Sequence, residues 1–527
     1  MLTRSTYDSH RVGDRCSWLM VNWLVAAATL LCTLLAVIDI QRPSYWVDEK
    51  VSVDIASAAT PQQVIANVIQ SERRPPAYHL LLWAWTRLVS MNERTARLFS
   101  VLWAILLVPA TYQLTRQFAT PRAAVLASYL SAIAPIVISY GQIIRYYSMV
   151  AALSALSFAL FFAVMRRPRG RKPWVLYAAV TLLLLYTDYP SYGVVVAQNL
   201  ITIWWWIHPE RAPHHPRWRW FGMQAIMAML AVLWLPVVLM QGTRNFGVAD
   251  LSSTASGAIL RIIYPFYAWI TGETIFPWTV FGFLGAVVGG VLVIVGLIKL
   301  THASREAWIL AFAPPFIVAQ ILLGTVAEDS PFVNAPARSM ACAGLLFTLE
   351  GVGLSAVSVD RRWLADASAG VVVVSHAIAL SNDYRGVDYI NTVYNTPARE
   401  VGEAIGAEAR PGDAVVTASD SMVEFYLPTD LRDSSFYPNQ VQRIHSYLAT
   451  HQHANVWQVI MGRDRTRNDV SAKLAEWLKS QYTLESSQGF AEQSVTYRAV
   501  KTRLIGRKAY RYRLVLYHYV PTTQPQK

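Results

Sequence analysis

Charged residues are scarce in this chain of 527 residues, where Asp, Glu, Lys and Arg together make up 15%. A surface that faces water needs about a quarter of charged residues, so the scarcity argues against an ordinary soluble enzyme and against a disordered protein. Cysteine is also rare, and Cys16, Cys32 and Cys342 all fall in apolar stretches. No disulfide framework is indicated, and the sequence has none of the spacings typical of metal sites.

Apolar and aromatic residues dominate instead: 54% of the residues are hydrophobic, and there are 19 Trp and 26 Tyr. This balance predicts a polytopic α-helical membrane protein with about 11 to 13 membrane helices, since a span needs roughly 20 apolar residues. We predict spans near 17–39, 96–115, 123–141, 146–165, 174–188, 192–207, 220–240, 278–298, 307–325, 339–357 and 363–381, with a shorter apolar run at 77–90.

The chain has a net charge of +13, and the positions of its basic residues in the loops predict the orientation. Basic clusters before the first span and at 166–172, 208–219, 299–305 and 360–362 are expected in the cytoplasm. The N-terminus is then cytoplasmic, and the segment after residue 382 is extracytoplasmic. This alternation requires that the run at 77–90 does not cross fully, as in a re-entrant segment. The natural location is the plasma (inner) membrane of a bacterium or archaeon.

A second domain is predicted at 383–527, after a membrane domain at 1–382. Apolar runs shorten to strand length there, and charged residues return. We expect helices at 397–409 and 470–482, and strands from 414, at 456–461, near 494–500 and at 512–520. These elements predict a small extracytoplasmic α/β domain.

The first outer loop, at 40–76, carries an acidic pair, Asp48 and Glu49, at the outer end of a span. Acids beside lipid are costly, so such a pair usually faces a water-filled cavity where it has a function. The alternatives are a helix cap and a solvated loop. A divalent cation could bind these oxygens, but one Asp–Glu pair has too few ligands to predict a metal site.

Arg145 and Arg338 fall at the outer ends of predicted spans, level with the acidic pair. A guanidinium is permanently charged and shaped to bind phosphate oxygens. An interfacial arginine in an aromatic belt is an equal alternative for Arg145, which is followed by Tyr146 and Tyr147. Two outer arginines opposite two acids suggest an anionic ligand.

Short motifs follow one another along most of the chain: Trp46–Glu49, Pro75-Pro76 with Tyr78 and Trp83, Glu93–Leu98, Gln142–Tyr147, Tyr186–Tyr189, Arg338, Asp383–Gly386 and Pro411–Val416. Each motif is short, and their order is the specific part. In this order they resemble the GT-C class of membrane glycosyltransferases, above all the protein O-mannosyltransferases and bacterial aminoarabinose transferases, which use polyprenyl-phosphate sugars as donors.

The resemblance implies a role for each matching residue. Asp48 is the catalytic base, with Glu49 as its acidic neighbour. The donor phosphate is bound by Arg145, Tyr147 and Arg338. The acceptor or sugar pocket is formed by Glu72, Arg74, Tyr78 and Asp188, although relatives often have histidines at the positions of Arg74 and Asp188 and an acid at Ile143.

The chemistry fits these residue types. An acceptor hydroxyl needs a base, and a phosphate leaving group needs electrostatic stabilisation rather than a second carboxylic acid. We expect a glycosyltransferase that moves one sugar, with inversion, from a polyprenyl-phosphate donor to a glycan, lipid-linked or protein acceptor. The protein is expected to contact membrane lipids and not nucleic acid, and the sequence does not define a cofactor. A polytopic lipid or sugar transporter or flippase is the alternative, although the paired halves typical of transporters are missing from the sequence. A membrane-anchored binding protein is a third class.

Overall fold

The computed structural model describes residues 5–72, 74–90, 92–166, 170–208, 217–243, 255–303, 335–418, 421–461, 469–490, 496–497, 499–500, 503 and 514–522. Their contacts form two compact units. The first comprises Met1–Ile40, Ser52–Leu251 and Ile259–Val387, and the second comprises Gln41–Val51, Ser252–Ala258 and Asp388–Lys527.

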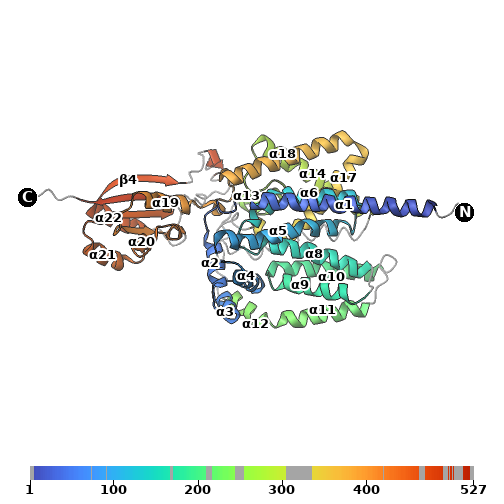
Figure 1. Cartoon of the computed structure of the whole chain (residues 1–527), viewed down its shortest axis with the longest axis horizontal. Helices are drawn as coiled ribbons and strands as arrows, with labels where there is room; N and C mark the ends of the chain where they lie inside the picture. The colour runs from blue at the N-terminus through green and yellow to red at the C-terminus, as the bar shows by residue number, and fades with distance from the viewer. Residues whose placement is uncertain are drawn as a thin grey trace, which may run out of the picture. The chain divides into compact units, whose positions relative to one another are not determined.

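The first unit is a helix bundle, in which α1, α5, α8 and α17 run side by side (Figure 1). Figure 1 shows α3, α4 and α12 at the end of the bundle opposite to the start of α1. Its helices are α1 (Ser5–Val37), α3 (Pro61–Ser71), α4 (Ala77–Leu88), α5 (Glu93–Thr115), α6 (Pro121–Ile133), α7 (Pro135–Gly141), α8 (Tyr147–Arg166), α9 (Lys172–Leu185), η1 (Tyr189–Ser191), α10 (Tyr192–Ile207), α11 (Arg217–Val232), α12 (Leu235–Thr243), α14 (Val280–Ala303), α16 (Ala335–Arg338), η3 (Met340–Cys342), α17 (Ala343–Asp360) and α18 (Arg362–Arg385), together with the second half of α2 (Val47–Ala56) and the part of α13 (Ala255–Thr271) from Ile259 on.

Six helices in the described ranges are long and apolar enough to cross a membrane, or eight if each of two bent helix pairs is one span. One bent pair is α6 with α7, at an angle of 52°. Pro135 begins α7, and a proline cannot donate the backbone hydrogen bond that would continue α6. The shorter helices α9 and α10 match the spans predicted at 174–188 and 192–207, and the span predicted at 307–325 lies outside the described residues.

Glycines allow the helices α14 and α17 to approach closely. A Cβ atom on Gly296 would lie 1.8 Å from the carbonyl oxygen of Leu349, and a Cβ atom on Gly353 would lie 1.9 Å from that of Leu292. Small residues at a helix contact are the usual way in which backbones approach in membranes. Gly285 and Gly289 also lie against neighbouring helices, which agrees with a packing role for this Gly-x-x-x-Gly pair.

The loop between α1 and α4 is helical over much of its length. Thr60 caps α3, because its side chain accepts a hydrogen bond from the backbone N–H of Gln63, and Pro61 occupies the first helical position. Pro76 then precedes α4, whose 12 residues, Ala77–Leu88, are fewer than the roughly 20 that a full crossing needs. The short apolar run predicted at 77–90 is therefore a short helix.

The second unit contains a five-stranded sheet in the order β2-β1-β3-β5-β4. The pairs β1–β2 and β1–β3 are parallel, whereas β3–β5 and β4–β5 are antiparallel. Its elements are the first half of α2, η4 (Thr392–Asn395), α19 (Ala398–Glu408), β1 (Ala414–Thr417), η5 (Val423–Phe425), α20 (Thr429–Arg432), β2 (Ser435–Phe436), α21 (Val441–Thr450), β3 (Val456–Met461), α22 (Asp469–Gln481), β4 (Tyr482–Phe490) and β5 (Leu514–Pro521).

Two apolar cores cover the two faces of this sheet. Alternate residues of β1 and β3 point to opposite faces, so Val415 and Trp457 pack with α19, while Val416 and Val456 pack with α21 and α22. The second unit therefore has helices on both faces of a mixed sheet, as in an α/β protein. The strand expected near 494–500 is wrong, because the described residues there are helical and the strand is the earlier β4. β4 has exposed polar side chains and lacks the apolar pattern of a buried strand.

Candidate active site

A cluster of charged and aromatic side chains lies inside the first unit, among turns that join its helices. Glu72 follows the last residue of α3, and Arg74 is two residues later. Arg145 lies in the turn between α7 and α8, and Asp188 lies in the turn between α9 and η1. Arg74 and Asp188, which are 114 residues apart in the chain, therefore meet here.

Arg145 is the centre of this cluster and is only 4% exposed. Its Nη1 atom lies 2.5 Å from Oε1 of Glu72, and its Nη2 atom lies 3.4 Å from Oε2 of the same carboxylate. Nη1 also donates to the hydroxyl of Ser52 at 3.0 Å. A forked pairing with one carboxylate fixes the plane of a guanidinium as well as its position. Arg145 is thus held in a defined orientation.

Arg74 forms a second ion pair, in which its Nη1 atom donates to Oδ1 of Asp188. The guanidinium carbon of Arg74 lies 4.1 Å from the centre of the Tyr146 ring, and that of Arg145 lies 5.4 Å from the same ring. Stacking of a guanidinium on an aromatic face adds a favourable cation–π interaction. Tyr146 therefore contributes to holding both arginines.

The two carboxylates respond differently to this environment. Burial by itself raises the pKa of Glu72, but the charges of Arg145 and His79 outweigh burial and lower this pKa to about 2. Burial raises the pKa of Asp188, and the opposing charges of Arg74 and Arg338 do not cancel that rise. Glu72 is consequently the firmly ionised partner at neutral pH.

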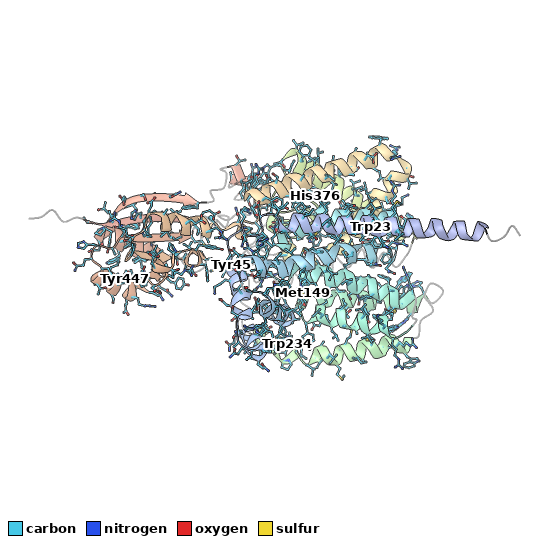
Figure 2. All side chains as sticks on the ribbon, in the orientation of Figure 1. Trp23, Tyr45, Met149, Trp234, His376 and Tyr447 are labelled. Carbon is cyan, nitrogen blue, oxygen red and sulfur yellow. The ribbon has the colours of Figure 1, made fainter. Side chains whose placement is uncertain are left out.

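Tyrosines line the cluster. The Tyr78 hydroxyl lies 3.2 Å from the Ser100 hydroxyl, and the Tyr78 ring packs edge-on to the Tyr146 ring. The Tyr147 ring contacts Tyr146, with 4.7 Å between the ring centres. Figure 2 shows Trp234 at the end of the bundle where α3 and α12 lie, and its indole N–H donates to the Tyr189 hydroxyl at 3.0 Å.

Of the residues predicted for the donor phosphate and the acceptor pocket, six are brought together in this cluster, and Arg338 is close enough to affect the pKa of one of them. Sequence reasoning missed Ser52, His79 and Tyr146. Ser52 follows Asp48 by four residues in α2, and this helical spacing was the available signal. The six are Glu72, Arg74, Tyr78, Arg145, Tyr147 and Asp188.

Asp48 and Glu49 begin α2, in the part of that helix which packs with the second unit. Acids in the first turn of a helix interact favourably with its N-terminal partial charge. Glu49 is 1% exposed, and its Oε2 atom accepts a hydrogen bond from the backbone N–H of Trp46 at 3.4 Å. In the described part of the chain, no group of three or more His, Cys, Asp or Glu side chains is arranged to hold a metal ion.

The structure is similar to the crystal structure of ArnT from Cupriavidus metallidurans bound to undecaprenyl phosphate, with a TM-score of 0.50, 14% identity, and coverage of 97% of this chain and 99% of ArnT. The apo form of the same protein gives a TM-score of 0.48, 14% identity, and coverage of 96% and 98%. An oligosaccharyltransferase from Archaeoglobus fulgidus, tethered with an acceptor peptide, gives a TM-score of 0.44, 13% identity, and coverage of 84% and 70%. No protein-family model and no curated protein matches the chain.

The likeness to ArnT covers nearly the full length of both chains. The protein therefore has the fold of ArnT, and the predicted fold class, a polytopic helical protein with a C-terminal α/β unit, is confirmed.

Proposed function

We propose that this protein is a glycosyltransferase that moves a single sugar from a polyprenyl-phosphate donor to an acceptor hydroxyl on the extracytoplasmic face of the plasma membrane. The observation that carries the proposal is the pair of arginines, the buried Arg145 and the half-buried Arg74, in a fold shared with a protein crystallised with undecaprenyl phosphate. Buried arginines in a membrane protein are costly to maintain, and they usually mark a ligand site.

The donor phosphate is bound by Arg145, Arg338 and Tyr147. Glu72 and Ser52 hold the Arg145 guanidinium in one orientation before the donor arrives, and such preorganised charge stabilises a developing anion without reorganisation. The second ion pair, between Arg74 and Asp188, belongs to the neighbouring pocket for the sugar or acceptor. Tyr78 belongs to the same pocket.

Asp48 is the base in this mechanism, with Glu49 as its acidic neighbour. Asp48 removes the proton of the acceptor hydroxyl, and the acceptor oxygen forms a bond to the anomeric carbon of the sugar. The bond between that carbon and the phosphate oxygen breaks, and its electron pair leaves with the polyprenyl phosphate, whose charge the arginines stabilise. This direct displacement inverts the anomeric centre, and it requires no second carboxylic acid.

Transfer in vitro tests the proposal, with purified protein and a panel of synthetic polyprenyl-phosphate sugars. We expect the parent to release polyprenyl phosphate from at least one donor in the presence of an acceptor, and Asp48→Asn to lose about a hundredfold or more in rate, since a positioned base contributes about 10²–10⁴. A parent that is inactive with every donor, but that moves the labelled lipid across a vesicle membrane, would point to a flippase. Full activity of Asp48→Asn would disprove the assigned base.

A further inference from the structure

The segment from Gln41 to Val51, which carries the proposed base, belongs to the second unit by its contacts. Sequence reasoning assigned the whole outer loop at 40–76 to the membrane domain, so this grouping was not expected. Tyr45, labelled in Figure 2, and Val47 pack against the apolar core formed by α19, β1 and β3. Trp46 is 5% exposed, and its ring packs edge-on to Tyr394 at 5.2 Å between ring centres.

Hydrogen bonds fix the backbone of this segment as well as its side chains. The backbone N–H of Tyr45 donates to the Tyr426 hydroxyl at 2.7 Å. The backbone N–H of Arg399 donates to the Ser44 hydroxyl at 2.9 Å, and the Arg399 guanidinium donates to the carbonyl oxygen of Gln41 at 3.1 Å. Three successive points of the chain before Asp48 are therefore tied to α19 and to the turn after η5.

The two anchoring side chains also hold each other. The Arg399 guanidinium carbon lies 4.6 Å from the centre of the Tyr426 ring, a cation–π contact that restrains the tyrosine hydroxyl. Lys50, on the other side of Asp48 in the chain, has its Nζ atom 4.7 Å from the centre of the Phe425 ring. Contacts on both sides of the acidic pair therefore reach two consecutive residues, Phe425 and Tyr426.

The anchors act close to the start of α2. Helix α2 begins at Val47, and Asp48 occupies its first turn, so a shift of Tyr45 moves the end of the helix that carries the carboxylate. A displacement of about 1 Å in a catalytic group can cost about a hundredfold in rate. An anchor two to four residues away from the base is therefore close enough to control its position.

We propose that the C-terminal part of the second unit, Asp388–Lys527, positions the catalytic base. The Tyr426 hydroxyl and the Ser44–Arg399 hydrogen bond fix the backbone that presents Asp48. This inference rests on the proposed function, because it takes Asp48 as the base. Tyr426 and Ser44 are positioning residues, and they act on the reaction through Asp48. The C-terminal part of the second unit is then required for the chemical step, whether or not it also binds an acceptor.

Tyr426→Phe and Ser44→Ala test this inference in the full-length protein, with Tyr447→Phe as the matched control. Tyr447 also lies in the second unit, and its hydroxyl donates to the carbonyl oxygen of Gly412 at 3.0 Å, outside the anchored segment. We expect Tyr426→Phe and Ser44→Ala each to lower kcat by about tenfold or more while the donor KM stays within about twofold, because the base is displaced and the donor phosphate site is unchanged. Tyr447→Phe keeps the parental kcat.

A double-mutant cycle with Asp48→Asn separates positioning from a general structural effect. If Tyr426 acts through Asp48, Tyr426→Phe costs less than about twofold in rate once Asp48 is already Asn. The inference is overturned if both anchor variants keep the parental kcat, if Tyr447→Phe loses as much as they do, or if the loss persists in the Asp48→Asn background. An inactive parent or a fully active Asp48→Asn would instead refute the proposed function.

Discussion

The ion pair between Glu72 and Arg145 offers a quantitative prediction for Glu72→Gln, which keeps the shape of the side chain and removes its charge. In the folded protein the pKa of Glu72 falls from its usual 4.5 to about 2. Each pKa unit corresponds to about 1.4 kcal/mol, so the charged form is stabilised by about 3 kcal/mol. This agrees with the roughly 3–5 kcal/mol that is lost when one partner of a buried ion pair is removed. We expect Glu72→Gln to lower the free energy of unfolding by about 3 kcal/mol at pH 7.

The pH dependence of this loss has a defined sign. The folded-state pKa is lowered, so the stabilisation is fully present above the unfolded value near 4.5 and is lost as pH falls toward 2. Denaturant unfolding in detergent should therefore give a constant difference between parent and variant from pH 8 to pH 5. Glu476→Gln, on an exposed position of α22, is the control and should change little. A difference below about 0.5 kcal/mol at pH 7, within the usual range for an exposed substitution, would refute the reasoning.

Two further predictions concern the bundle. Glu273 accepts hydrogen bonds from Tyr140 and Tyr264, but burial raises its pKa to about 7. The folded protein therefore loses stability as pH rises from 4.5 to 7. Glu273→Gln should raise the melting temperature at pH 8 and leave it nearly unchanged at pH 4.5, which scanning calorimetry in detergent can measure. Gly353→Ala would place a Cβ atom 1.9 Å from a backbone carbonyl oxygen of α14, so we expect a loss of folded protein in size-exclusion chromatography. Gly290→Ala is the control, because nothing lies within 4 Å of the added Cβ atom, and it should behave like the parent. Equal behaviour of the two alanine variants would contradict the close approach of α14 and α17.

Much of the fold could be predicted from the sequence, because long apolar runs have one stable solution in a membrane. The spans at Glu93–Thr115 and Tyr147–Arg166 lie within a few residues of their predicted positions. Helix α3 was missed because it belongs to a loop and has only 11 residues. The edge strand β4 was missed because an exposed strand does not need the apolar alternation on which the prediction depended.

The candidate site was predicted as a set of residue types, but not as a set of pairs. The sequence marked Arg145 and Glu72 separately, and nothing in their spacing of 73 residues predicts that they share a hydrogen bond. The same applies to Arg74 and Asp188, which meet only because the start of α4 lies beside the end of α9. Tertiary pairing depends on how helices pack, and apolar periodicity does not encode it.

Binding of undecaprenyl phosphate tests the central claim, that the buried arginine cluster receives a lipid-linked phosphate, most directly. Native mass spectrometry or calorimetry in detergent can compare the parent with Arg145→Gln, and with Arg116→Gln at an exposed helix end as the control. We predict that the parent binds the lipid and that Arg145→Gln weakens binding by about tenfold or more, since a hydrogen bond to a charged group contributes about 1.5–3 kcal/mol. Arg116→Gln should have the parental affinity. Equal affinity of the parent and Arg145→Gln would contradict the account.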